Sequence, residues 1–210
     1  MNFLHTYGWQ FCTVAMIGDI VVPQILSLLY KGYCCTKMSI SALGNPNSPV
    51  RLPFNLWMIF EGLLFLAALP AIYKYYNPIS DGLTKVLAVF VAAFAIGACI
   101  CTGFFSVNES KDLVTTASKI HGAGSAIGFM LFLFVPLLLA ILSCKNRESG
   151  IAVISIVSFV ISLTFFVLFV LSDKPAFKNT VIQNEGLWQR LNLIFMYVPL
   201  IIVSVKRALH

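Results

Sequence analysis

Six apolar runs, each about 20 residues long, divide this 210-residue chain and constrain what it can fold into. A hydrocarbon layer of roughly 30 Å is crossed by about 20 helical residues, and a helix satisfies its backbone hydrogen bonds within its own segment. A membrane barrel would need short segments of alternating polarity instead. The sequence therefore predicts an all-α polytopic membrane protein, a single domain over residues 1–210 with six transmembrane helices in one bundle. The predicted spans cover about residues 10–30, 53–73, 84–105, 119–143, 151–172 and 186–205.

The amino-acid composition agrees with a membrane protein and argues against other classes of protein. Charged residues make up only 10% of the chain, against about 25% in soluble proteins. The net charge of +6 does not indicate a nucleic-acid partner, because the basic residues lie singly at the ends of apolar runs, where they anchor helices at the membrane interface. The six cysteines form no C-x-x-C pattern and most lie in predicted spans. We therefore expect no metal site, and the sequence leaves any cofactor unknown.

An even number of spans places both termini on one side of the membrane, called here the terminal side; the opposite side is called the far side. The short terminal-side loops and tail carry a concentration of basic residues, which favours cytoplasmic termini in a cell membrane under the positive-inside rule. These residues are Lys74, Lys85, Lys145, Arg147, Lys206 and Arg207. The first run lacks a basic start and a small-residue cleavage site, so we expect a retained span rather than a signal peptide.

Two carboxylates lie at middle depth in the first two spans. Asp19 stands in "AMIGDIVVPQILSLLY", four residues before Pro23, which we expect to disturb the helix just beyond it. Glu61 stands in "NLWMIFEGLLF". An ionisable group in a span costs about 2.5–3.5 kcal/mol on insertion scales, so each is a functional hypothesis. Because consecutive helices are usually neighbours, we expect the two acids to share a cavity.

Two further ionisable groups enter from the far side. His121 begins the fourth span and is a candidate acid or base, together with Asp19 the candidate catalytic pair. Arg190 lies one turn into the sixth span, with Trp188 and Gln189 beside it, and its fork suits a carboxylate or a lipid phosphate. We predict that Glu61, Arg190, Gln189 and Trp188 bind a ligand.

The segment "KMSISALGNPNSPV", residues 37–50, is the most polar stretch of the chain and joins the first two spans on the far side. A passive connector could be shorter. Ile40, Ala42 and Leu43 give the segment apolar residues to press onto the bundle, while Ser39, Ser41 and Asn45 are candidates to bind a headgroup. The sequence therefore predicts a folded lid or rim over a polar opening.

Each of these residues also has a purely structural interpretation. Asp19 and Glu61 could bond within the bundle, His121 could sit at the interface, and Arg190 and Trp188 could be interface anchors. The glycines near the start of the fourth span, together with Ser125, indicate a small-residue packing face rather than a phosphate loop; they are Gly122, Gly124 and Gly128. A three-histidine zinc site and a haem with paired histidine ligands are disfavoured, because the other histidines are His5 and His210 near the termini. A serine nucleophile assisted by His121 stays open, since sequence does not show hydrogen-bond geometry.

Several of these segments together resemble the prokaryotic membrane family filed as domain of unknown function 998. They are "GDIVVPQI", "YKGYCCTKMSISALGNPNSPV", "NLWMIFEGLLF", the histidine that opens the fourth span, and "EGLWQRLNL". The resemblance covers nearly the whole chain and implies a six-helix membrane protein of unassigned activity. It points to Asp19, Pro23, Ser39, Ser41, Gly44, Pro49, His121 and Arg190, without giving any of them a role.

Three functions fit the sequence. The first is a membrane protein whose polar intramembrane site opens on the far side and binds, and in one version also processes, the headgroup of a membrane lipid or other amphiphile. The second is a proton- or cation-coupled carrier of a small solute that uses Asp19 and Glu61, although no inverted repeat of broken helices is visible. The third is a non-catalytic accessory protein. Whether the chain is an enzyme, and its oligomeric state, stay open.

Overall fold

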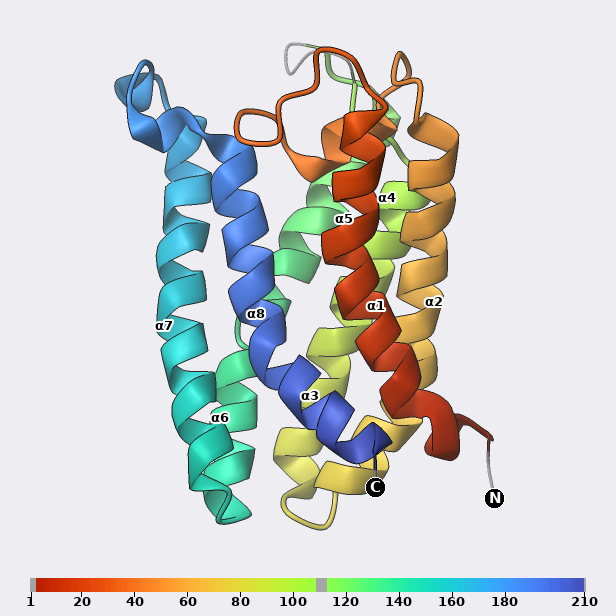
Figure 1. Cartoon of the computed structure of the whole chain (residues 1–210), viewed down its shortest axis with the longest axis vertical. Coiled ribbons are helices and arrows are strands. Elements are labelled where there is room, and N and C mark those ends of the chain that lie inside the picture. The colour runs from red at the N-terminus through yellow and green to blue at the C-terminus, as the bar shows by residue number, and fades with distance from the viewer. Residues whose placement is uncertain (1–2, 109–112, 210) are drawn as a thin grey trace.

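The computed structural model describes residues 3–108 and 113–209, which form an all-α bundle without a strand (Figure 1). Six helical segments are long and apolar enough to cross a membrane, and they pack together, which confirms the predicted fold class. They are α1 (Phe3–Leu28), α2 (Arg51–Tyr76), α3 (Asp81–Ala93) with η2 (Phe94–Ile100) and α4 (Cys101–Phe104), α5 (Thr116–Phe132) with α6 (Val135–Lys145), α7 (Ser149–Ser172) and α8 (Glu185–Ala208). Both ends of the chain lie at the lower end of the bundle in Figure 1.

The far side carries three connections, two of which contain short 3-10 turns. The first of these turns is η1 (Ile40–Gly44), and the others are η3 (Pro175–Phe177) and η4 (Val181–Gln183). α1 runs through Pro23 to Leu28 without ending, so the expected disturbance does not interrupt that helix. The third span contains the π-helical turn η2, which the apolar pattern did not indicate. π-Turns inside α-helices frequently accompany functional sites.

The fourth span is two helices rather than the single helix expected over residues 119–143. α5 ends at Phe132 and α6 begins at Val135. Pro136 has no amide hydrogen to donate to the carbonyl oxygen of Phe132, and its ring crowds the preceding turn. The hydropathy pattern does not reveal the break, because the residues on both sides of it are apolar.

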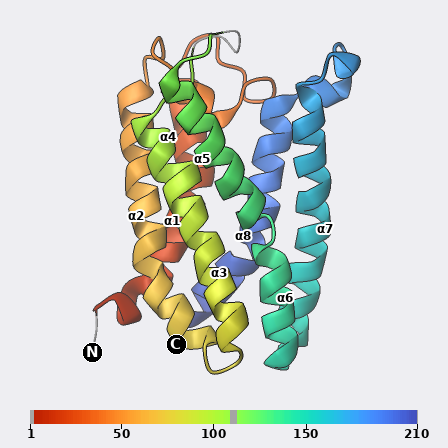
Figure 2. The same cartoon turned by 180° about the vertical axis from the view of Figure 1, so that it is seen from behind.

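The break lets the two halves of this span pack against different partners. α5 lies mainly against η2, with α3 and α4 beside it, whereas α6 packs mainly on α7 and also meets α8 and α3. Figure 2 shows α5 and α7 standing apart in the far-side half of the bundle, with α6 beside α7 in the terminal-side half. The backbones of α5 and α7 are therefore separated in the far-side half of the bundle.

α5 approaches η2 so closely that their backbones touch. A Cβ atom on Gly97 would collide with the carbonyl oxygen of Gly124, and one on Gly128 would lie 2.9 Å from the amide nitrogen of Ala98. The small-residue packing face is thus confirmed for Gly124 and Gly128. It is wrong for Gly122, where a Cβ would meet no atom within 4 Å.

On the terminal side, a partly exposed ionic network ties α2, α8 and the loop before α7 together. Glu148 accepts hydrogen bonds from Lys206 at 2.9 Å and from Arg207 at 3.3 Å. The Arg207 guanidinium also lies 4.0 Å from the centre of the Tyr75 ring and bonds to the Tyr75 hydroxyl. Partial burial alone would raise the pKa of Glu148, but the hydrogen bonds and positive charges around it hold that pKa below its usual value.

We predict that Gly97→Ala strongly destabilises the bundle, because the added methyl group meets a backbone carbonyl that has no side-chain freedom to move. The expected loss is about 2–3 kcal/mol, within the range for overpacking. Thermal unfolding of the detergent-purified protein measures it. The matched control is Gly82→Ala in α3, where a Cβ meets nothing within 4 Å. Equal melting temperatures for the two variants would contradict the close contact.

We also predict that Glu148→Gln lowers the melting temperature at pH 7 by a few degrees, about 1 kcal/mol. Because the folded-state pKa is lowered, the stabilisation is present above the ordinary glutamate pKa of about 4.3 and is lost as the pH falls through the folded-state value. The difference between variant and parent should therefore shrink in acid. Asp81→Asn is the control, since its ion pair with Lys85 is exposed and contributes less.

Candidate functional site

A cavity of about 430 Å³ lies in the far-side half of the bundle, where α5 and α7 separate. Residues of α1, α2, α5, α7, α8 and the third span line it, and residues 29–50, called here the lid loop, contribute Ser39, Ile40 and Ser41. Met130 on α5 and Val170 on α7 line the cavity while 54% and 47% exposed, respectively. The cavity therefore reaches the lipid-facing surface between these two helices.

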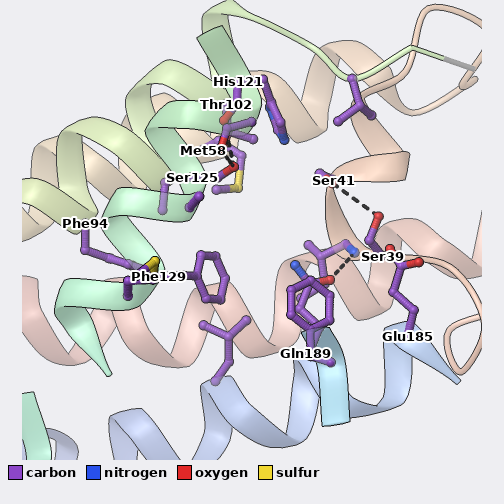
Figure 3. Close-up of a pocket in the computed structure, with 18 of the residues that line it drawn as sticks. Ser39, Ser41, Met58, Phe94, Thr102, His121, Ser125, Phe129, Glu185 and Gln189 are labelled. Atoms are coloured by element: carbon purple, nitrogen blue, oxygen red, sulfur yellow. Dashed lines mark hydrogen bonds between the residues drawn. The ribbon is translucent and has the colours of Figure 1, made fainter. Parts of the chain in front are cut away.

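The polar side chains of the cavity gather at its far-side rim (Figure 3). Ser39 and Ser41 have their hydroxyl oxygens 3.2 Å apart. The side-chain oxygen of Gln189 accepts a hydrogen bond of 2.7 Å from the backbone amide of Ile40, which fixes the lid loop against α8. Thr102 from α4 and Glu185 at the start of α8 complete this rim. Gln189 thereby keeps its amide nitrogen as a donor without a partner among the described residues.

His121 projects from α5 toward the cavity (Figure 3). Its Nδ1 lies 2.9 Å from the carbonyl oxygen of Phe105. Because a carbonyl oxygen only accepts, Nδ1 carries the hydrogen, and Nε2 of the neutral ring is left as an acceptor. No described residue donates to Nε2, although the His121 side chain is buried. Ser125, one turn further along α5, donates its own hydroxyl to the His121 carbonyl at 2.6 Å.

The two span carboxylates meet at the inner end of the cavity. Asp19 lines it and accepts a hydrogen bond of 2.7 Å from the Tyr197 hydroxyl. Glu61 interacts with Asp19 from behind; one of its oxygens faces the Cys99 sulfur at 3.6 Å, and the other has no partner. Two adjacent carboxyl groups buried without a cation in contact cannot both stay ionised. A proton or a bound cation must balance the pair.

A family model described as "Protein of unknown function (DUF998)" matches residues 13–206. The chain belongs to this family. The match covers the resemblance predicted from the sequence and all the candidate site residues. Comparison with curated proteins and with solved structures gave no match. The family therefore establishes a membrane protein of uncharacterised activity, and the site must be interpreted from its own geometry.

In this member of the family, the structure brings six of the predicted site residues to one place and keeps three away from it. Ser39, Ser41, Asp19, His121 and Gln189 line the cavity, and Glu61 contacts Asp19. Arg190, Trp188 and Asn45 do not line it. No group of three or more histidine, cysteine or acidic side chains that could hold a metal ion occurs in residues 3–108 and 113–209.

Arg190 fastens the lid loop instead of facing the cavity. Its guanidinium donates to the carbonyl oxygens of Cys35 at 2.7 Å and Met38 at 3.2 Å, and to the Tyr33 hydroxyl at 2.8 Å. Gly186 allows this approach, because a Cβ there would collide with the same two carbonyl oxygens. The guanidinium thus binds backbone acceptors. That Arg190 does not face the cavity could not be deduced from sequence, because the path of the lid loop decides it.

Trp188 and Asn45 also have structural partners. The Trp188 indole donates to the Ile182 carbonyl at 2.9 Å and stacks on Phe165. The Asn45 amide donates to the Ala42 carbonyl at 2.6 Å, and its side-chain oxygen accepts from the Asn47 amide, which shapes the turn after η1. Both residues hold far-side segments in place. The buried Ile40 and Leu43 confirm that the lid loop is folded onto the bundle.

Sequence reasoning missed the apolar part of the site. Phenylalanines from four helical segments line it: Phe54, Phe94, Phe129, Phe166 and Phe169. Their spacing does not differ from that of core or lipid-facing residues, so no local signal separates them. Pro136 was the one residue that could have indicated the cavity, because it breaks the fourth span and so lets α5 lie apart from α7.

We predict that Arg190→Lys loosens the lid loop while keeping the charge, because an ammonium group cannot reproduce the forked set of bonds. Hydrogen exchange of peptides covering residues 33–44 should accelerate by about tenfold, equivalent to about 1.4 kcal/mol. Arg51→Lys, at the exposed start of α2, is the far-side control and should leave this segment unchanged. Equal protection in both variants would exclude Arg190 as the clamp.

Proposed function

We propose that this protein binds an amphiphile, such as a membrane lipid, in the far-side cavity. The polar headgroup lies between the rim made by Ser39, Ser41, Gln189 and His121 and the carboxyl group of Asp19. The apolar tail lies along Phe166 and Phe169 of α7 and leaves the protein between α5 and α7. The observation that carries the proposal is a single cavity with a polar rim and an apolar flank that reaches the lipid-facing surface.

The geometry of the mouth supports entry from within the membrane. Gly122, Ala126 and Met130 follow one face of α5 along the opening, and Val170 stands on the opposite side. A tail already solvated by lipid reaches this position without crossing water. The lid loop covers the cavity from the far side, where Arg190 and Gln189 hold it down. The positive-inside preference makes the far side the extracytoplasmic one, which remains part of the proposal.

If the protein also processes the headgroup, His121 is the group equipped for it. Its Nε2 is an unoccupied acceptor that faces the cavity, so it can take a proton from a ligand hydroxyl or from water. Asp19 would balance charge rather than orient His121, because the Phe105 carbonyl already fixes the imidazole. Ser39 and Ser41 bond to each other and act as headgroup contacts in this proposal.

The carrier alternative is favoured by one observation, the buried pair of Asp19 and Glu61. Against it, the residues on the terminal side of this pair are fully buried, including Met16, Phe65 and Tyr197. A solute would need a large rearrangement to pass them. Proton or cation flux in proteoliposomes that disappears in Asp19→Asn would support a carrier. Loss of stability in Asp19→Asn and Arg190→Gln, without any ligand retained by the parent, would support an accessory role.

We predict that Gly122→Phe reduces amphiphile retention by about tenfold or more, because the ring would occupy the mouth of the cavity from a position where a Cβ atom meets nothing within 4 Å. Native mass spectrometry and lipid extraction of the purified protein measure the bound molecule. Gly150→Phe in α7 is the matched control, since it adds the same ring at another open helical position, on the terminal side. Equal retention in the two variants would remove the mouth between α5 and α7 from the binding path.

A further inference from the structure

The described residues that line the cavity include carboxylates, hydroxyls, one amide and aromatic rings, but no lysine or arginine. Asp19 and Glu185 contribute the carboxylates. Lys37 and Lys119 line an adjoining cavity of about 540 Å³, which shares Ser39, Val107 and Glu185 with this one but reaches neither Asp19 nor the phenylalanines. Arg190, which the sequence suggested as the cationic ligand contact, donates its hydrogen bonds to the lid loop instead. An anionic headgroup would therefore meet a buried carboxyl pair without a compensating charge.

The hydrogen-bonding groups point to the same ligand class. His121 is a buried residue that lines the cavity, and its Nε2 is left as an acceptor. Asp19 offers a carboxylate with one protein donor, Tyr197. Ser125 has already given its hydrogen to the His121 carbonyl, so its hydroxyl is also left to accept. Gln189 keeps an amide donor, but the acceptors on His121, Asp19 and Ser125 match the three donors of a primary ammonium group better than they match a phosphate.

The aromatic lining adds attraction for a positive charge. Phe94 and Phe129 line the inner part of the cavity, and Phe54 lies on its α2 side. The face of an aromatic ring attracts a cation within about 6 Å, and the attraction grows when the site is desolvated. Pro23 adds a further acceptor near the acids, because it has no amide hydrogen for the carbonyl oxygen of Asp19.

We infer that the bound amphiphile carries a cationic amine headgroup, with Asp19 as its counter-ion and Glu61 as the partner that shares the charge. This inference rests on the proposed function and narrows its ligand to one class, the cationic amphiphiles: alkyl amines, which also supply N–H donors, and quaternary ammonium amphiphiles, which bind through charge and the aromatic rings alone. It also explains the buried pair: the cation takes the place of the proton that otherwise balances Asp19 and Glu61. Arg190 then acts on the ligand only through the lid loop.

Matched probes test the inference. The protein in lipid nanodiscs is titrated with decylamine, decyltrimethylammonium, decanol and decyl phosphate, each below its critical micelle concentration. The binding measured with empty nanodiscs is subtracted from the binding measured with the protein. We expect the two cationic probes to bind at least about tenfold more tightly than decyl phosphate. The parent protein alone gives this comparison, so it does not depend on how a variant folds.

Two variants separate the inference from the proposed function. Asp19→Asn keeps an acceptor for Tyr197 but removes the charge, and it should abolish the preference for cationic probes; Asp81→Asn on the terminal side should not. Gly122→Phe should weaken all probes. The cationic, neutral and anionic probes could bind equally well to the parent and all be blocked in Gly122→Phe. That result would overturn the cationic headgroup and leave the proposed function standing. Absence of saturable binding by every probe, with no effect of Gly122→Phe, would overturn both.

Discussion

The missing amide hydrogen of Pro136 shapes the functional half of this bundle. In a membrane, a helix has no water to replace a lost backbone hydrogen bond, so a break survives only where packing compensates for it. Here α6 packs on α7 and α8 on the terminal side, while α5 packs on η2. The two halves of one span thus belong to different parts of the bundle. The cavity is the space that their divergence leaves on the far side.

Close backbone contact keeps that space from collapsing. Gly97 and Gly124 allow α5 to lie directly on the π-helical turn, which draws α5 away from α7. On the other side, the buried serines of α7 stand at helical spacing and bond to their own backbone, which leaves a small surface for α8; they include Ser155 and Ser162. Small residues therefore allow close helix packing on both sides of the cavity, of α5 on η2 and of α7 on α8, as is common between membrane helices.

The ionisable groups on the far side divide into two roles according to whether their hydrogen bonds are already satisfied. Arg190 donates hydrogen bonds from both terminal nitrogens to the lid loop, Tyr33 and Gly186, so it is structural. His121 has one bonded nitrogen and one free one, and Glu61 has a buried oxygen without a partner. Unsatisfied buried groups cost free energy, so they indicate where a ligand, proton or cation is accommodated. That distinction, rather than charge alone, locates the site.

The sequence alone determined the class, the number of spans and the far-side location of the polar residues. Hydrophobic length and composition dictate these properties, and six of nine candidate site residues proved to lie in or against one cavity. It also determined that residues 37–50 would fold onto the bundle, because Ile40 and Leu43 needed burial. Only the tertiary structure decided that Arg190 faces the lid loop and that phenylalanines from four segments share a wall. Those outcomes depend on helix rotation and on which backbones touch, and apolar side chains in a membrane carry no local pattern that specifies either.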